Sequence, residues 1–272
     1  MYKMIAIDMD DTLLTDTLTI TPGTAEAIKK AIDVGVLVTL ATGRMFPSAL
    51  PFASQLGLNV PLITYQGAIV KDITGKNIMY ERFVPSDISC RAIEIARQKN
   101  VHIQVYQDDI LYSPEDNDKI RRYANVAGVP YTIEPDLYRL AKRDFIKLLY
   151  YDEPEALDAL AKELNEEFGE AAYITKSKPY FLEVMHPEAS KGQAILHLAK
   201  MFGIDRSKII GIGDSYNDID LIKVAGLGVA MGNAPEFIKQ KADYVTRSNN
   251  EEGVRHVIEE FVLQKSTKSG SF

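Results

Sequence analysis

The sequence predicts an α/β protein: a mostly parallel sheet with helices on both faces, interrupted by an inserted α/β domain. Two observations indicate the sheet. Short apolar runs alternate with helical periodicity in residues 1–84, and the same alternation returns in residues 187–272. A third observation indicates the insert, because residues 85–186 show strand-like alternation and hold most of the tyrosines. We therefore expect a core domain of residues 1–84 and 187–272, and an inserted domain of residues 85–186.

The N-terminal piece predicts strand, helix, strand, helix and strand in that order. Apolar side chains recur at helical spacing after Pro22, which suits the first turn of a helix, and Gly35 ends that helix. A second helix is expected although Pro51 lies within it. The five expected elements are residues 2–8, 21–35, 36–43, 47–58 and 61–70.

The C-terminal piece repeats this alternation and ends in a polar tail. Ser190 is expected to cap the first helix, Gly226 to stop the second, and Asn233 to cap the third. The tail, residues 264–272, is expected to fray. The other expected elements are helices 190–204, 217–226, 233–242 and 250–263, and strands 208–214, 227–232 and 243–246.

The insert predicts an antiparallel sheet with one face covered by helices, because apolar and polar residues alternate along its strand-like segments. The clearest segments are strands at 102–113, 145–152 and 179–186, and helices at 86–100 and 153–169.

Composition excludes several classes of partner. Of the 272 residues, 46% are hydrophobic and 25% charged, so the chain can bury a sizeable core. Lysine and arginine number 31 against 38 aspartates and glutamates, which gives a net charge of −7. This acidic balance argues against nucleic acid or an anionic membrane as the main partner. The oligomeric state is left open.

Cysteine count and hydropathy indicate a cytoplasmic protein. Cys90 is the single cysteine, which excludes an intrachain disulfide and a cysteine-rich zinc site and fits a reducing compartment. The N-terminal apolar run is too short for a signal peptide, and no apolar run approaches the roughly 18 residues that a membrane-spanning helix needs.

Acidic residues follow the predicted parallel strands at their carboxyl ends. Asp8 ends the first strand, and Asp214, with Asp218 four residues later, follows the strand at 208–214. Because ligands bind outside the carboxyl ends of parallel strands, we expect these carboxylates to converge. They cannot all stay ionised without a counter-charge, and hard oxygen ligands near a phosphate suit Mg²⁺.

The same residue types suit chemistry on phosphorus. One carboxylate can attack as a nucleophile, and Asp10, two residues after Asp8, can act as general acid and base. Thr42 offers a hydroxyl and Gly43 an unobstructed amide to the phosphate oxygens. Lys191 begins its helix, where the macrodipole disfavours a cation unless an anion is bound nearby.

Four segments carry a family resemblance: "DMDDT", "ATGR", "SKG" and "GDSYND". In this order and spacing they resemble the four motifs of the haloacid dehalogenase superfamily. The insert between the second and third motifs resembles the α/β cap of its Cof-type sugar-phosphate phosphatases. The resemblance covers nearly the whole chain and implies a Rossmann-like core. It also implies a Mg²⁺-dependent phosphatase of small phosphorylated metabolites, whose cap closes over the substrate and selects it.

The resemblance also implies roles for single residues. Asp8 would be the nucleophile that becomes an aspartyl-phosphate, and Asp10 the general acid and base. Asp8, Asp10 (through its carbonyl), Asp214 and Asp218 would hold the metal. The phosphate would be bound by Met9 (through its amide), Thr42, Gly43, Lys191 and Asn217.

Four residues stand apart from this assignment. Asp11 stands where many relatives have glycine, and Gln66 stands where asparagine is usual; neither change removes a reacting group. Arg44 is a candidate for contact with the substrate or for a structural role. Asp220 is expected to be exposed.

Other functions remain open at this point. A phosphomutase of the same superfamily would return the phosphoryl group to a second hydroxyl. A phospho-acceptor module pairs similar residues on a parallel sheet, but such modules are shorter and the strand at 61–70 offers no aspartate. A non-catalytic metabolite-binding protein would not need the pair of Asp8 and Asp10.

Overall fold

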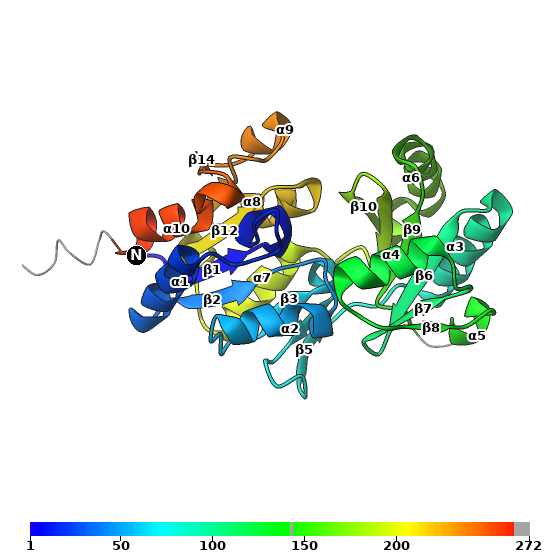
Figure 1. Cartoon of the computed structure of the whole chain (residues 1–272), viewed down its shortest axis with the longest axis horizontal. Coiled ribbons are helices and arrows are strands. Elements are labelled where there is room, and N and C mark those ends of the chain that lie inside the picture. The colour runs from blue at the N-terminus through cyan, green and yellow to red at the C-terminus, as the bar shows by residue number, and fades with distance from the viewer. Residues whose placement is uncertain (142–143, 264–272) are drawn as a thin grey trace, which may run out of the picture. The chain divides into compact units, whose positions relative to one another are not determined.

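The structure is a computed structural model that describes residues 1–141 and 144–263 (Figure 1). The predicted frayed tail lies outside these residues. The described chain forms two compact units. We call residues 1–43, 49–80 and 190 onward the core unit, and residues 44–48 and 81–189 the insert unit. The predicted boundaries at residues 84 and 187 stay a prediction.

The core unit is built on a five-stranded sheet in which every neighbouring pair is parallel. The α/β fold class is thus confirmed. Strand β1 lies between β12 and β2, so the N-terminal strand is flanked on both sides. The order is β14-β13-β12-β1-β2, with bounds β1 (Met4–Ile7), β2 (Leu37–Leu40), β12 (Ile209–Gly213), β13 (Leu227–Ala230) and β14 (Tyr244–Val245).

Helices cover both faces of this sheet. Met4 and Ala6 of β1 pack with apolar residues of α7, while Ile5 and Ile7 point to the opposite face and are also fully buried. Ser190 caps α7 as predicted, because its side chain accepts a hydrogen bond from the Gln193 amide. The helices are α1 (Pro22–Asp33), α2 (Phe46–Gln55), α7 (Lys191–Met201), α8 (Ile219–Val224), α9 (Glu236–Lys239) and α10 (Gly253–Ile258).

Two predictions about the strands and helix caps of the core unit are wrong. The single strand predicted at 61–70 is two antiparallel strands, β3 (Leu62–Thr64) and β4 (Ile69–Lys71), and β5 (Ile78–Glu81) completes a small sheet. The chain reverses between them because Tyr65, Gln66 and Gly67 all have positive φ angles. Asn233 also does not cap α9. It donates instead to the Asp11 carbonyl, 2.8 Å away.

The insert unit contains a six-stranded sheet whose pairs are antiparallel, except that β7 and β8 run parallel. Apolar residues of α3 and α6 pack on one face, as predicted. The half-buried Cys90 packs at the edge of this cluster. The order is β10-β11-β9-β6-β7-β8. The elements are α3 (Ser86–Lys99), β6 (His102–Gln107), β7 (Ile110–Ser113), α4 (Asp118–Ala127), β8 (Tyr131–Ile133), α5 (Leu137–Leu140), β9 (Lys147–Tyr151), α6 (Pro154–Phe168), β10 (Tyr173–Lys178) and β11 (Phe181–Met185).

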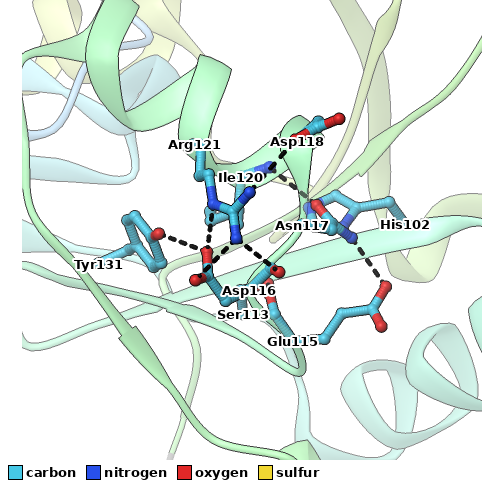
Figure 2. Close-up of polar contacts among 9 residues, drawn as sticks. All are labelled: His102, Ser113, Glu115, Asp116, Asn117, Asp118, Ile120, Arg121 and Tyr131. Carbon is cyan, nitrogen blue, oxygen red and sulfur yellow. Dashed lines mark hydrogen bonds and ion pairs between the residues drawn. The ribbon is translucent and has the colours of Figure 1, made fainter.

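Polar side chains fix the start of α4, as Figure 2 shows. Asn117 accepts a hydrogen bond from the Ile120 amide at 3.1 Å, and its amide nitrogen lies 3.1 Å from Nδ1 of His102. Beside it, Asp116 accepts hydrogen bonds from Arg121 at 2.9 Å and from the Tyr131 hydroxyl at 2.6 Å. Asn117 thereby ties the helix to β6, and Tyr131 ties the same turn to β8.

A buried ion pair crosses the sheet of the insert unit. Lys147 Nζ lies 2.9 Å from Glu183 Oε1, and both side chains are nearly fully buried. Burial lowers the pKa of Lys147, but the charge of Glu183, the nearby Tyr123 and the hydrogen bond to Glu183 together outweigh it, so the pKa is raised. Ser177 donates a further hydrogen bond to Glu183, and Lys147 lies 4.7 Å from the ring centre of Tyr106.

We expect Lys147→Met to destabilise the protein by about 3–5 kcal/mol, because it removes the buried ammonium ion that faces the buried Glu183 carboxylate. Equilibrium unfolding in urea measures the loss. The exposed pair of Lys99 and Glu163 is the matched control, and Lys99→Met should cost less than about 1 kcal/mol. Equal effects of the two substitutions would contradict the expectation.

A search of the described residues finds no helix that is long and apolar enough to cross a membrane.

Candidate active site

The central carboxylates lie at the carboxyl ends of two adjacent strands. β1 and β12 pair in parallel with Ile7 opposite Ile212, and the Asp8 amide donates to the Ile212 carbonyl at 3.0 Å. Asp8 therefore follows β1 at the edge where Asp214 follows β12. The predicted convergence of strand ends accounts for this pair.

A tight turn over residues 9–13 brings a threonine into contact with the second carboxylate. A hydrogen bond from the Leu14 amide to the Met9 carbonyl, 2.9 Å long, closes the turn. Asp11 within it has φ 61°, a left-handed conformation that glycine adopts freely and aspartate tolerates. Glycine would adopt this conformation without strain. The turn places Thr12 Oγ1 2.9 Å from Asp214 Oδ1, to which it donates.

Three carboxylates form a compact buried cluster. One oxygen each of Asp8, Asp214 and Asp218 lies within 4.8 Å of the others, and all three residues are buried. Burial raises the pKa of Asp214 to about 7, with further repulsion from Asp218 and an opposing hydrogen bond from Thr12. Burial and then repulsion from Asp218 raise the pKa of Asp8 well above its usual range. The cluster therefore demands positive charge.

Lys191 supplies part of that charge. Its side chain is fully buried, and Nζ lies 2.5 Å from Asp8 Oδ1 and 2.6 Å from Asp218 Oδ1. Burial lowers the pKa of Lys191, but the attraction of these two carboxylates is stronger, so its pKa is raised and it stays an ammonium ion. One ammonium ion bridges two of the three carboxylates.

Asp218 uses both of its oxygens to hold its neighbours. While Oδ1 contacts Lys191, Oδ2 accepts hydrogen bonds from the amides of Asp214 at 3.1 Å and Ser215 at 3.0 Å. It therefore fixes the loop after β12, where a short 3₁₀ turn spans Tyr216–Asp218.

A second part of the site joins the loops after β2, β3 and β12. The Gln66 amide donates to the Thr42 carbonyl at 3.0 Å, and its side chain lies so close to Gly43 that a Cβ there would overlap it. Gln66 Oε1 accepts a hydrogen bond from Asn217 Nδ2 at 2.8 Å. Asn217 Oδ1 is buried and, among the described residues, has no hydrogen-bond partner.

Three other residues predicted for the site are Met9, Asp10 and Arg44. Met9 is fully buried in the turn after Asp8, and Asp10 is half-buried there and close enough for its charge to help raise the pKa of Asp8. Arg44 belongs to the insert unit, where its Nη1 lies 3.4 Å from the Ser48 hydroxyl. Sequence reasoning did not single out Thr12, although it stands in "DMDDT".

Comparisons with known proteins find a matching family model, a similar sequence and a similar solved structure. The model of the haloacid dehalogenase-like hydrolase family matches residues 5–258. A Bacillus subtilis protein, 5-amino-6-(5-phospho-D-ribitylamino)uracil phosphatase YwtE, is 31% identical over 96% of this chain and 98% of its own. The solved structure of TM0651 from Thermotoga maritima is 36% identical with a TM-score of 0.84, and covers 96% of this chain and 98% of its own.

The fold comparison extends to a phosphatase with an assigned subclass. The structure of the HAD subclass IIB sugar phosphatase BT4131 has a TM-score of 0.86 over 95% of this chain and 98% of its own. At 24% identity, this likeness concerns the fold.

Proposed function

Because this chain belongs to the haloacid dehalogenase-like hydrolase family and is a phosphatase, we propose that it is a Mg²⁺-dependent phosphomonoesterase of small phosphorylated metabolites, with sugar phosphates first among them. The observation that carries the proposal is the buried cluster of Asp8, Asp214 and Asp218, bridged on one side by Lys191. A nucleophilic carboxylate, an acidic cation site and an ammonium group suit hydrolysis of a phosphate monoester.

The donor set fits a hard divalent cation. Asp8 and Asp214 would bind it through carboxylate oxygens, and Asp10 through its carbonyl. Asp218, whose oxygens already contact Lys191 and two amides, would mainly hold Asp214 in place. When bound, the cation would offset the repulsion between the phosphate and the carboxylate that attacks it.

The chain's own residues account for the two chemical steps. An Asp8 oxygen attacks phosphorus, the bond from phosphorus to the leaving oxygen breaks, and Asp10 gives that oxygen a proton. Asp10 then takes a proton from the water that attacks the aspartyl-phosphate, which releases phosphate and restores Asp8. Lys191 favours the ionised form of Asp8 before the attack and donates to the phosphate oxygens after it.

The phosphate would be held by donors from several loops. The Met9 and Gly43 amides, the Thr42 hydroxyl and the second hydrogen of the Asn217 amide would each donate to it. Arg44 is the remaining candidate for contact with the substrate. We assign substrate choice to residues 85–186 as a cap domain, and the cytoplasmic location stays a prediction.

The test is phosphate release from a panel of phosphate monoesters, with Mg²⁺ and with chelator. The panel holds sugar phosphates and also 5-amino-6-(5-phospho-D-ribitylamino)uracil, for which the Bacillus subtilis relative is named. We expect release that requires the metal. Release in chelator at the same rate would overturn the metal dependence, and an isomeric phosphate ester in place of free phosphate would indicate a mutase.

The raised pKa of Asp214 predicts how magnesium binding depends on pH. Its pKa rises from about 4 in the unfolded chain to about 7 in the metal-free fold. A carboxyl with a raised pKa favours the fold while protonated, so its contribution is present below pH 4 and is lost as pH rises towards 7. Mg²⁺ binds the ionised form and should restore the loss.

We therefore expect millimolar Mg²⁺ to raise the melting temperature more at pH 8 than at pH 5. Calorimetry with and without the metal measures both shifts. Asp214→Asn should remove most of the difference, whereas Asp205→Asn, at an exposed cap in the same unit, should leave it unchanged. Equal shifts at the two pH values would contradict this assignment.

A further inference from the structure

One carboxylate ties the start of α7 to the start of α8. Asp220 Oδ2 accepts a hydrogen bond from the Gly192 amide at 2.8 Å, and Oδ1 lies 2.8 Å from the Leu221 amide. The expectation that Asp220 is exposed is wrong, because it is half-buried against α7. The first amides of a helix lack partners within the helix, and here another helix supplies one of them.

This contact lies one residue from the lysine of the site. α7 begins at Lys191, Ser190 caps the amide of Gln193, and Asp220 caps the amide of Gly192. The first turn of the helix therefore has two side-chain acceptors, one for the amide of Gly192 and one for the amide of Gln193.

Two glycines allow other segments to pack closely against the backbone around Lys191. A Cβ on Gly192 would lie 2.9 Å from the backbone carbonyl of Asp220 and 3.0 Å from its Oδ2. A Cβ on Gly67 would overlap the Ser190 carbonyl and lie 2.8 Å from the Lys191 nitrogen. Packing this close leaves the backbone of Lys191 little freedom.

Holding this backbone matters because the lysine side chain is long and its target is small. Nζ must stay within hydrogen-bond distance of both Asp8 and Asp218, although four flexible bonds separate it from the helix. A displacement of about 1 Å at a reacting group can cost about 10²-fold in rate.

We propose that Asp220 is a positioning residue for the reaction: by capping Gly192 it fixes the start of α7 and so places Lys191 between Asp8 and Asp218. This inference rests on the proposed function, in which Lys191 acts on Asp8 and the phosphate. Asp220 itself touches neither Asp8 nor Lys191 in any recorded hydrogen bond or ion pair of the described residues.

The test compares Asp220→Ala with Asp220→Asn and with a matched control. Asp243→Ala removes the same kind of contact elsewhere in the core unit, where Asp243 Oδ2 accepts from the Gly228 amide at 2.8 Å. We expect Asp220→Ala to lower kcat about 10–100-fold with a smaller change in KM. Asp220→Asn keeps an acceptor oxygen and should recover most of the rate. Asp243→Ala should stay within about twofold of the wild type.

A double variant separates positioning from a general loss of structure. If Asp220 acts through Lys191, then Asp220→Ala should change kcat by less than about twofold in a Lys191→Met background. The inference would be overturned if the loss of kcat in the double variant were the product of the losses in the two single variants. Equal losses in Asp220→Ala and Asp243→Ala would overturn it as well. Melting temperatures identify any variant that fails to fold. If Asp220→Ala does so, Asp220→Ser, whose side chain is too short to reach the Gly192 amide, carries the comparison and should show the same loss of kcat.

The outcomes distinguish this inference from the proposed function. If the wild type releases phosphate and Asp220→Ala is as fast, only the positioning role fails. If the wild type releases no phosphate from any monoester, the proposed function fails. In that case Lys191→Met and Asp220→Ala would be compared by the affinity of the metal-bound protein for vanadate, which the positioning role predicts to fall in both.

Discussion

Asp8→Asn will lower phosphate release by at least about 10⁴-fold, since an amide cannot replace the attacking carboxylate. Asparagine has the same shape, and Lys191 keeps its contact with Asp218 at 2.6 Å. The melting temperature should therefore stay within about 5 °C of the wild type. Single-turnover assays with Mg²⁺ and a sugar phosphate measure the loss.

A nearby aspartate, Asp11, offers a control for this result. Asp11→Asn removes a charge three residues away, at a position whose side chain has no role in the proposed reaction. Its φ of 61° is one that asparagine also tolerates. We expect its rate within about threefold of the wild type. A rate above about 1% in Asp8→Asn would remove Asp8 as the nucleophile.

Lys191→Met should lower both activity and stability. The substitution leaves the buried carboxylates of Asp8 and Asp218 facing each other without their ammonium ion, which should cost the metal-free protein about 3–5 kcal/mol. The loss of a preorganised donor should lower kcat by about 10²–10³-fold. Chemical denaturation in chelator and steady-state kinetics in Mg²⁺ measure the two effects separately.

The stability loss in Lys191→Met should depend on pH. The raised pKa of Lys191 means that its contribution is complete below about pH 10 and is lost only above that. The pKa of Asp8 is raised by burial even with Lys191 present, and Lys191 lowers it. Without Lys191 the carboxyl should therefore take up a proton more readily as the pH falls, so the loss should be smaller at pH 5 than at pH 8. Lys200→Met, at an exposed position of the same helix, is the control and should change neither quantity. A Lys191→Met protein as stable and active as the control would contradict the role of the buried ammonium ion.

The sequence predicted the parts of the site that follow from strand ends. Asp8 and Asp214 each come directly after an apolar run, and parallel strands bring such residues to one edge. Ser190 was recognisable as a helix cap from its type and place. These inferences needed only local pattern and one rule of sheet topology.

The contacts that sequence could not predict depend on loop conformation or on helix packing. Thr12 reaches Asp214 only because the turn at Asp11 is left-handed, and Gln66 reaches Asn217 because the chain reverses at residues 65–67. The same reversal divides residues 61–70, which the sequence predicted as one strand, between β3 and β4. Asp220 meets Gly192 across 28 positions, through the packing of two helices.

The place of β1 in the sheet has a consequence for the order in which a newly made chain can fold. β1 pairs with β2 within the first 40 residues, but its other edge pairs with β12, which ends at Gly213. During synthesis, Asp8 therefore follows a strand with one open edge until about three quarters of the protein has left the ribosome. Contacts so distant in sequence form slowly, and an open strand edge invites pairing with other chains. Nascent chains in which residue 209 is still inside the ribosome should thus need chaperones more than chains in which residue 213 has emerged.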